Sequence, residues 1–521
     1  MINTMNLKYI VLSAFISSVF WGKAQAQSID DAVTFSKDEN PGTARTKGMG
    51  NVQTSIGGDI SSINGNPAGL GFYTRSDVSG TFNLLGNKNK TDYFGTNTNS
   101  SKTNFGLDQA GAVFYFPTYN RSGWQNFNLG ISYNKTQNFN SNLAYEGVNN
   151  NSTIVNTLTD LMANNTEFEK DFFLNSGMVE QFANKNDGYF PLAVSNGDKN
   201  QFNEVITRGN KNKTALSFGS NYNNKLYIGA SVGITSFNYE KSTQFIENGW
   251  TKTPDEIKVD NPNSSFADPS NPDYQYADAS YELFDNFRQV TAGTGVDIKV
   301  GAIFKPTTDW NVGVTITTPT WMNVQDDTRA YTDIDYYDNA TASSPFKSYE
   351  SKYYDGSADY KLTTPWKFSV GATKLFSRGL ISADVEYVTY NTIRYSTPNN
   401  TPNFNYNSVN QGIKDNLQGV VNVRVGGEYL FTNVISGRAG FNYFGNPYKN
   451  ASDTNYSGSL GLGFKLTNSL YLDLAVVHQV NEYKSAPYTV SSFWNDRGVY
   501  SPVANITNQR TSGVITLGAK F

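Results

Sequence analysis

From Trp366 to Phe521 the chain alternates apolar and polar residues with a period of two. In its last segment Ile515, Leu517 and Phe521 share one face, and mainly small or polar residues share the other. This alternation indicates β-strands that lie between an apolar medium and a wetted surface. A soluble β-sandwich alternates in the same way, so the alternation alone does not choose between a sandwich and a membrane barrel.

The lengths of the connections favour a barrel. Short turns such as Asn223-Asn224, Ser377-Arg378 and Thr467-Asn468 alternate with long stretches rich in Asn, Ser, Thr, Asp and Tyr. Short periplasmic turns and long extracellular loops are typical of outer-membrane barrels. The sequence therefore predicts an all-β fold, a transmembrane antiparallel β-barrel of about fourteen strands. The candidate strands span approximately 76–85, 107–117, 126–137, 213–222, 224–240, 287–305, 309–322, 350–376, 379–395, 418–431, 434–445, 455–467, 469–483 and 510–521, and the long loops lie near 86–106, 138–212, 241–286, 323–349, 396–417 and 484–509.

Composition excludes a helical membrane protein. The 521 residues are 38% hydrophobic and 17% charged, with 34 Phe and 33 Tyr. Beyond the N-terminus there is no run of about eighteen apolar residues, which a membrane-spanning helix needs. The net charge of -4 provides no basic surface for nucleic acid.

The first 26 residues are predicted to be a signal peptide. Lys8 precedes an apolar stretch from Tyr9 to Trp21, and Ala24-Gln25-Ala26 forms a small-x-small cleavage site. The chain has no cysteine and a single histidine, His478, which excludes Cys/His nucleophiles and His-based metal sites. No Gly-x-Ser-x-Gly elbow is present either. We expect no enzymatic activity, no cofactor and no bound metal.

The region 27–75 precedes the first strand and does not alternate. It is rich in glycine and turn-forming residues, so it could be a solvated linker. A linker has little use for apolar side chains, however, and these look placed to pack against walls. We interpret 27–75 as a hatch folded inside the barrel formed by 76–521. The apolar residues are Met49, Val52, Ile56, Ile60, Ile63, Leu70 and Phe72.

The hatch sequence resembles a known family. Gly48-Met49-Gly50 followed by Asn66-Pro67-Ala68-Gly69-Leu70 resembles the N-terminal hatch of the FadL family, which includes long-chain fatty-acid and toluene transporters of the outer membrane. The strand opening Thr364-Pro365-Trp366 and the segment 379–384 also resemble that family. The resemblance spans the mature chain and is specific mainly in the hatch. The loops of this chain are longer and more polar than the family pattern.

The resemblance implies a barrel whose hatch blocks a straight pore. Hydrophobic cargo would be captured outside, bound in the lumen and released through a side gap in the wall. Residues Gly48, Met49, Gly50, Asn66, Pro67 and Ala68 would then be hatch residues that gate the channel. The alternative for Pro67 and the glycines is that they only make a turn.

Charged residues fall on the inward face of several strands, near the short turns. One interpretation is that they pair with each other or with the hatch and hold the barrel shut to water. The other is that they guide substrate. These residues are Asp384, Glu386, Arg424, Glu428, Arg438 and Asp473.

Two loop features stand out on the extracellular side. An insert near 150–186 carries an apolar stripe at helical spacing, which predicts either short helices that pack together or a surface that collects hydrophobic substrate. The stripe residues are Leu158, Leu161, Met162, Phe168, Phe172, Phe173 and Phe182. The acidic residues of 323–349, including Asp326 and Asp327, are expected to be solvated.

The sequence favours passive uptake of hydrophobic small molecules, most of all long-chain fatty acids. Burying each CH₂ group gains about 0.8 kcal/mol, so an apolar groove captures such cargo without energy input. The expected partners are a fatty acid or aromatic hydrocarbon, outer-membrane lipid, and the barrel assembly machinery through the last strand, which ends at Phe521. The alternatives are a secretion-associated barrel that serves as a shuttle or adaptor for surface proteins, and an open diffusion porin.

Overall fold

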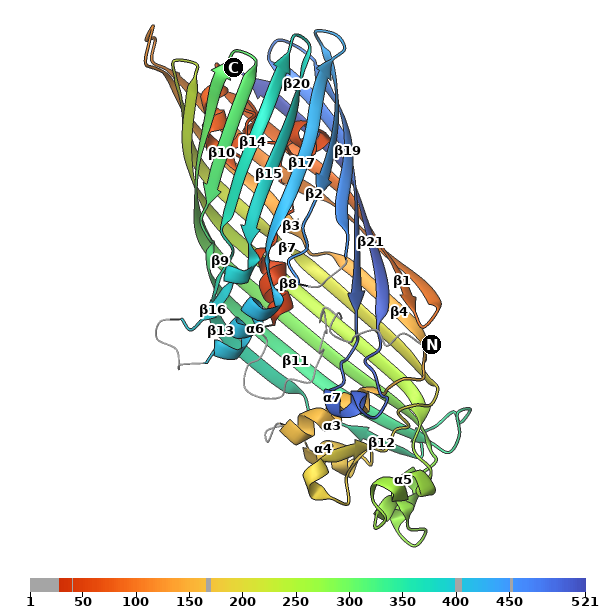
Figure 1. Cartoon of the computed structure of the whole chain (residues 1–521). Helices are drawn as coiled ribbons and strands as arrows, with labels where there is room; N and C mark the ends of the chain where they lie inside the picture. Colours follow the sequence, from red (N-terminus) through yellow and green to blue (C-terminus); the bar gives the residue numbers. More distant parts are fainter. Residues whose placement is uncertain (1–27, 40, 165–169, 399–404, 450–452) are drawn as a thin grey trace, which may run out of the picture.

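The computed structural model of the chain is a closed antiparallel β-barrel of 14 strands (Figure 1). The structure describes residues 28–39, 41–164, 170–398, 405–449 and 453–521, so the predicted signal peptide lies outside the described residues. The last ring strand pairs with the first, which closes the barrel. The ring consists of β1 (Asp77–Tyr93), β2 (Thr96–Pro117), β3 (Trp124–Asn138), β7 (Lys199–Tyr222), β8 (Leu226–Trp250), β9 (Ser280–Thr307), β10 (Trp310–Thr317), β14 (Lys367–Phe376), β15 (Gly379–Thr389), β17 (Gly419–Leu430), β18 (Ile435–Tyr443), β19 (Asn455–Lys465), β20 (Leu470–Ser485) and β21 (Ala504–Lys520).

Further strands and short helices extend the barrel at one end or fill its interior. The additional strands are β4 (Ser141–Asn149), β5 (Val179–Gln181), β6 (Tyr189–Pro191), β11 (Trp321–Tyr337), β12 (Lys347–Glu350), β13 (Tyr354–Thr363) and β16 (Arg394–Ser396). The α-helices are α1 (Ile29–Ser36), α2 (Ala44–Gly48), α3 (Ile154–Asn164), α4 (Lys170–Asn175), α5 (Pro254–Asp260), α6 (Asn407–Asn416) and α7 (Ser492–Asn495). The 3-10 helices are η2 (Ile60–Ile63), η3 (Pro67–Phe72), η4 (Lys185–Asp187), η5 (Ser265–Ala267), η6 (Pro272–Tyr276) and η7 (Tyr390–Thr392). Among the described residues, no helix has the length and apolar character needed to cross a membrane.

The half of the barrel near the short turns has an apolar outer face. On β8 the outward side chains from Leu226 to Ile234 are aliphatic, and Val232 and Ile234 are 48% and 57% exposed. Such a continuous exposed apolar belt is unfavourable in water and is typical of a lipid-facing surface. Beyond Ile234 the outward residues become polar, beginning with Ser236 and Asn238. The belt therefore ends near this level, and the strands continue past it.

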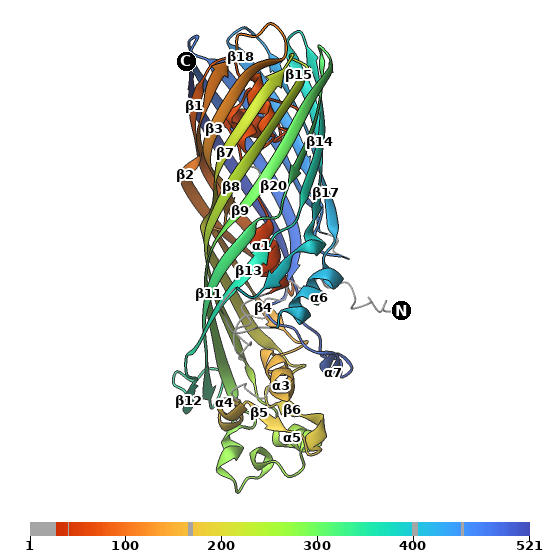
Figure 2. The ribbon, with the colours of Figure 1, turned by 90° about the vertical axis from the view of Figure 1, so that its left-hand side faces the viewer.

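These extensions correct the predicted loops. The segments 86–106, 138–212, 241–286 and 323–349 were expected to be irregular, but much of each is strand. β7, β8, β9 and β11 continue as a tall wall on one side of the barrel (Figures 1 and 2). Outside the membrane, neither face of this sheet needs an apolar residue at every second position. The sequence of these extensions therefore lacks the apolar–polar alternation found in the belt.

Two predicted strands are divided at the level where the wall begins. The segment predicted over 309–322 consists of β10 and the start of β11, and the one predicted over 350–376 includes β13 and β14. β10 pairs with β14 in the barrel, whereas β11 pairs with β13 in the wall. Pro319 and Pro365 lie in the two breaks, where their lack of an N–H group interrupts the ladder.

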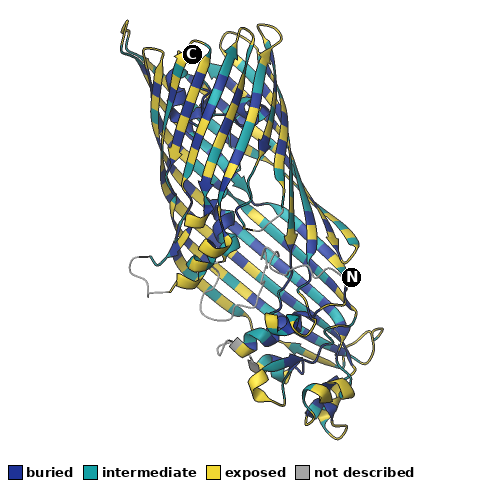
Figure 3. Cartoon of the chain, viewed as in Figure 1, coloured by how far each residue is buried: buried dark blue, intermediate teal, exposed yellow. Residues whose placement is uncertain are grey.

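A compact cap sits at the tip of the wall (Figure 3). Segments from 150–164, 170–198, 251–279 and 486–503 pack around one hydrophobic core that also includes inward residues of β8, β9 and β11. Glu247 of β8 is fully buried in this region and accepts hydrogen bonds from the backbone N–H of Ile154 and the hydroxyl of Tyr281, at 3.2 and 2.7 Å. The cap is therefore fixed to the wall by polar contacts as well as by apolar packing.

Candidate functional site: a plugged lumen with a polar cavity

The segment 41–75 fills the lumen near the short turns. Its helix α2 contacts β18 to β21, and its helices η2 and η3 contact the wall strands β1, β2, β3, β7, β8 and β9. Apolar hatch residues including Met49, Ile63 and Leu70 are fully buried. The segment therefore crosses the barrel from one side to the other and packs against both.

Asn66 connects the hatch to the wall. It precedes η3, and its side-chain oxygen accepts a hydrogen bond from the N–H of Ala68 at 3.0 Å, with Pro67 in the first helical position. Its Nδ2 donates to the carbonyl of Thr54 at 2.6 Å and to that of Ala302 on β9 at 3.3 Å. The Asn-Pro-Ala segment thus makes a capped turn and also fixes that turn to the barrel.

The Gly48-Met49-Gly50 segment lies directly against wall backbone. Gly50 has a φ of +65°, which favours glycine. A side-chain carbon at Gly426 of β17 would lie 2.6 Å from the Met49 carbonyl carbon, and one at Gly440 of β18 would lie 2.5 Å from the Gly50 Cα. Only glycine at these two wall positions lets the hatch backbone approach so closely.

Three of the predicted lumen charges form one buried ion-pair network with the hatch. Arg438 donates to Glu428 and to Asp473, both at 2.6 Å. Arg45 of the hatch donates to Glu428 at 3.0 Å. The side chains of Arg438, Glu428 and Asp473 are 5%, 12% and 6% exposed, so each charge depends on its partner.

The other predicted lumen charges lie on β15 and β17. Arg424 donates to Glu386 at 2.7 Å. Asp384 accepts hydrogen bonds from the backbone N–H groups of Gln53 and Thr54 at 2.7 and 2.9 Å. All six residues therefore pair with one another or with the hatch in this structure, which is the arrangement expected if they hold the lumen shut.

The first part of the predicted hatch forms a separate strap, residues 28–39, on the far side of the lumen. Ala32, Val33 and Phe35 of α1 are buried against inward residues of the wall and against α6. In Figure 2 this helix lies at mid-height, well below the rest of the hatch. The segment 27–75 contains no strand pattern, so its sequence predicted one body.

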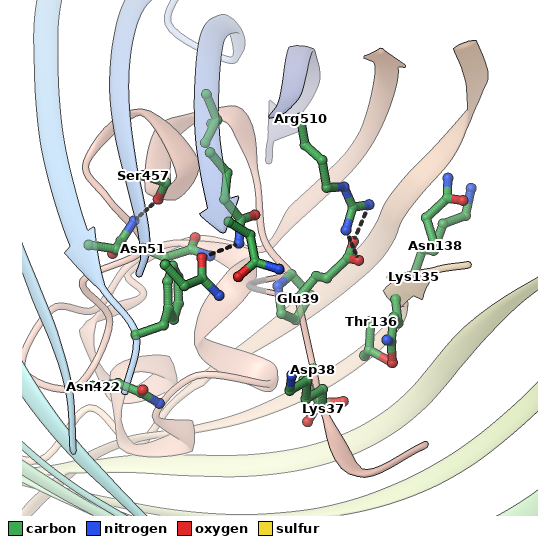
Figure 4. A pocket seen from close by; sticks show the side chains of 18 of the residues that line it. Lys37, Asp38, Glu39, Asn51, Lys135, Thr136, Asn138, Asn422, Ser457 and Arg510 are labelled. Atoms are coloured by element: carbon green, nitrogen blue, oxygen red, sulfur yellow. Dashed lines mark hydrogen bonds and ion pairs between the residues drawn. The ribbon is translucent and has the colours of Figure 1, made fainter. Parts of the chain in front are cut away.

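Ion pairs fix the end of the strap across the barrel. Asp38 pairs with Lys211 of β7 at 3.0 Å and also with Lys367 of β14. Glu39 pairs with Arg510 of β21 (Figure 4). Because β7, β14 and β21 lie on different sides of the ring, these contacts hold the strap over the lumen.

A cavity of about 620 Å³ lies between the strap and the hatch. This volume is within the roughly 300–1,000 Å³ of small-molecule pockets. Apolar side chains such as Leu85, Phe139 and Tyr239 contribute part of its lining, and most of the rest is polar. Nine lining residues are cationic, Lys37, Lys47, Lys135, Lys213, Lys299, Lys367, Arg424, Lys484 and Arg510, against seven that are anionic, Asp30, Asp38, Glu39, Asp108, Asp384, Glu386 and Asp453.

The cavity reaches a break in the wall between β2 and β3. These strands pair only over Gln109–Pro117 and Asn126–Asn134. Beyond that point β2 pairs with β1 alone, while β3 continues along β7. Asn104, Phe105 and Gly106 of β2 line the cavity at this break, opposite the end of β3.

Side chains rather than a ladder hold the β1–β2 hairpin beyond the break. Asn87 donates to the carbonyl of Asn140 at 3.1 Å, and Thr91 donates to that of Ala144 at 3.0 Å. No backbone ladder therefore has to be broken to widen this part of the wall.

The predicted capture residues lie mostly inside the cap. Leu158, Met162 and Phe173 are buried in its core, which is the arrangement of the first alternative, short helices that pack together, and not that of an open collecting surface. Partners distant in sequence, such as Trp494, cover them. Leu161, Phe172 and Phe182 are only partly buried against this core, and Phe168 lies outside the described residues.

Asp326 is another correction, because this residue was expected in a solvated loop. It is fully buried on the inward face of β11 and accepts a hydrogen bond from Thr291 at 2.8 Å. It lies outside the apolar belt, since the outward residues of β11 after Trp321 are polar. Burial raises the pKa of Asp326 to about 8, and the nearby Asp31 carboxylate of α1 adds to the rise.

We expect α1 to dock more weakly as pH rises. An unfolded Asp has a pKa near 3.8, so the Asp326 contribution to stability is complete below about pH 4 and is lost progressively up to about pH 8. Hydrogen exchange of the α1 amides, corrected for intrinsic rates, should increase several-fold from pH 5 to 8.5. Asp326→Asn should reduce this increase, and the part that remains comes from Asp30 and Asp31 of α1, because burial raises the pKa of each of these carboxyl groups as well. Asp327→Asn, on the exposed face of the same strand, should leave it unchanged, and equal effects of both substitutions would contradict the assignment.

Sequence reasoning missed the cavity lysines and the wall glycines. Lys213, Lys299 and Lys367 fall on the inward parity of their strands, so the period-two pattern contained the signal for them. The role of Gly426 and Gly440 depends on which hatch segment lies against them. That contact joins residues far apart in the chain, so the sequence around each glycine does not predict it.

Comparisons with known proteins give a match in structure alone. The sequence matches no protein-family model and no curated protein. The fold is similar to that of a FadL homologue from Pseudomonas aeruginosa, with 15% identity, coverage of 93% of this chain and 100% of that one, and a TM-score of 0.54. It is also similar to the toluene transporter TodX of P. putida, with 12% identity, coverage of 93% and 99%, and a TM-score of 0.51.

Proposed function

We propose that this chain, a bacterial outer-membrane protein with the fold of the FadL-like transporters, takes up hydrophobic small molecules passively. The cargo favoured by the site is a long-chain fatty acid. Cargo would enter from the extracellular side, occupy the cavity between strap and hatch, and leave sideways at the break between β2 and β3. The hatch would prevent a straight aqueous pore.

The observation that carries this proposal is the mixed lining of the cavity. Apolar side chains suit a hydrocarbon tail. Lys135 and Lys299 line the cavity with no Asp or Glu oxygen within 4.0 Å of their ammonium groups among the described residues, and they suit a carboxylate head. An aromatic hydrocarbon such as the toluene carried by TodX has no charged group to use these cations. An amphiphile with an anionic head therefore fits the cavity better than a neutral hydrocarbon does.

The occupied lumen argues against the open diffusion porin. Among the described residues, 41–75 contacts both sides of the barrel and is held there by a buried ion pair with the wall, which supports a closed lumen. A porin would need the hatch to be absent.

Uptake of labelled oleate in a host lacking its own fatty-acid transporter tests the proposal. The wild-type chain should restore uptake, and Asn66→Ala should lower it roughly ten-fold at equal surface levels, because the lost buried hydrogen bonds release the hatch from its docked position. Asn99→Ala provides the control, since Asn99 is exposed on β2 and does not line the cavity. No uptake by a well-folded wild-type barrel would refute the proposal.

A further inference from the structure

Two lysines at the break in the wall have no carboxylate partner. Among the described residues, no Asp or Glu oxygen lies within 4.0 Å of the ammonium group of Lys102 or Lys135. Several cations deeper in the cavity are neutralised by ion pairs. These pairs are Lys47 with Asp108, Lys213 with Asp297, Lys367 with Asp38, Arg424 with Glu386 and Arg510 with Glu39.

The Lys135 side chain crosses the break. It follows Tyr133 on the outward face of β3, at an irregularity in the pairing between β3 and β7. Its Nζ atom nevertheless lies 3.2 Å from the position of a side-chain carbon built on Gly106 of β2. Lys135 also lines the cavity, where Figure 4 shows it next to Thr136. Its ammonium group therefore stands in the passage between the cavity and the outside of the barrel.

The passage opens at the edge of the apolar belt. Phe105, which lines it from β2, is 72% exposed, and Leu107 follows on the same outward face. Water and salt screen the charge of a cation less beside such an apolar surface than they do in bulk water. The cation therefore attracts anions more strongly there. An amphiphile in this passage could place its tail along Phe105 and Leu107 and its head at Lys135.

We propose that Lys135 is a specificity-determining residue at the wall opening, where it favours amphiphiles with an anionic head over neutral hydrocarbons. Lys102 lies on the inward face of β2 near the same break and adds positive charge there. This inference rests on the proposed uptake function and adds to it the residue that contacts the anionic head group of the cargo. The anion at Lys135 is then the carboxylate of the cargo, not a phosphate of the surrounding lipid.

Uptake of two labelled molecules of equal chain length, oleate and the neutral 1-octadecene, tests the role of Lys135. Lys135→Gln should lower oleate uptake about five-fold and leave octadecene uptake unchanged. A change of about five-fold is the effect on affinity expected from the loss of one charge contact that is only partly screened. Lys135→Arg keeps the charge and should retain the preference for oleate. Lys90→Gln is the matched control, because Lys90 is exposed on β1 of the same hairpin and does not line the cavity.

The other outcomes separate this inference from the proposed function. An equal loss of oleate and octadecene uptake in Lys135→Gln would assign the lysine to the structure of the wall or to a lipid phosphate, and would overturn its role in selection. Unchanged uptake of both molecules would overturn it as well. If the wild-type barrel imports neither molecule, the proposed function itself fails.

Discussion

Replacing Gly426 and Gly440 together by alanine should undock the hatch and turn a closed barrel into a conducting one. Each added methyl group would collide with the Met49–Gly50 backbone, which no side-chain rotation can relieve. Overpacking costs about 1–3 kcal/mol at each such site, and both costs fall on one short segment of the hatch. Single-channel recordings should change from no steady conductance in the wild type to large steady steps in the double variant.

Gly458→Ala is the matched control, because a side-chain carbon at this position on β19 meets no atom within 4 Å. This variant should remain closed. If the double variant folds and also stays silent, the hatch is not held by these close approaches, and the assignment of the two glycines is wrong.

Arg438→Met should destabilise the barrel strongly. It leaves Asp473 buried without its ion-pair partner at 2.6 Å, and it leaves Glu428 with Arg45 alone. Breaking a buried pair by removing one partner costs about 3–5 kcal/mol. Urea unfolding of the purified barrel, followed by gel mobility, should show a midpoint well below that of the wild type.

Arg288→Met tests whether burial causes this effect. Arg288 pairs with Glu240 at 3.0 Å on the wall, but its side chain is 57% exposed. Exposed pairs contribute about 0–1 kcal/mol, so the midpoint should hardly move. Similar shifts for the two substitutions would mean that the network around Arg438 does not stabilise the barrel as its geometry indicates.

The membrane-spanning part of the fold could be predicted because lipid imposes a strict pattern. On β8 and β21 every second residue within the belt must be apolar, and the period of two follows directly. In the wall outside the membrane, an apolar residue is not required at every second position. β7 and β9 therefore extend far into segments that were expected to be loops, and β7 carries Asn on both faces, with Asn200 outward and Asn203 inward.

The candidate site was predictable only in part. Apolar residues such as Met49 and Leu70 indicated a packed hatch, and inward parity indicated the charges at Glu428 and Arg438. The pairs that these charges form depend on residues up to several hundred positions away, as with Arg45 and Glu428. The stripe around Leu158 shows the same limit, because helical spacing predicted an apolar face but not the distant segments that bury it.

We expect the cavity between strap and hatch to hold a hydrophobic molecule with an anionic head. Saturation binding of labelled oleate to the purified barrel tests it most directly, with detergent alone as the background. We predict saturable binding above that background, competed by unlabelled oleate far better than by toluene. Binding that never exceeds the detergent background, or that toluene displaces as well as oleate does, would contradict the account.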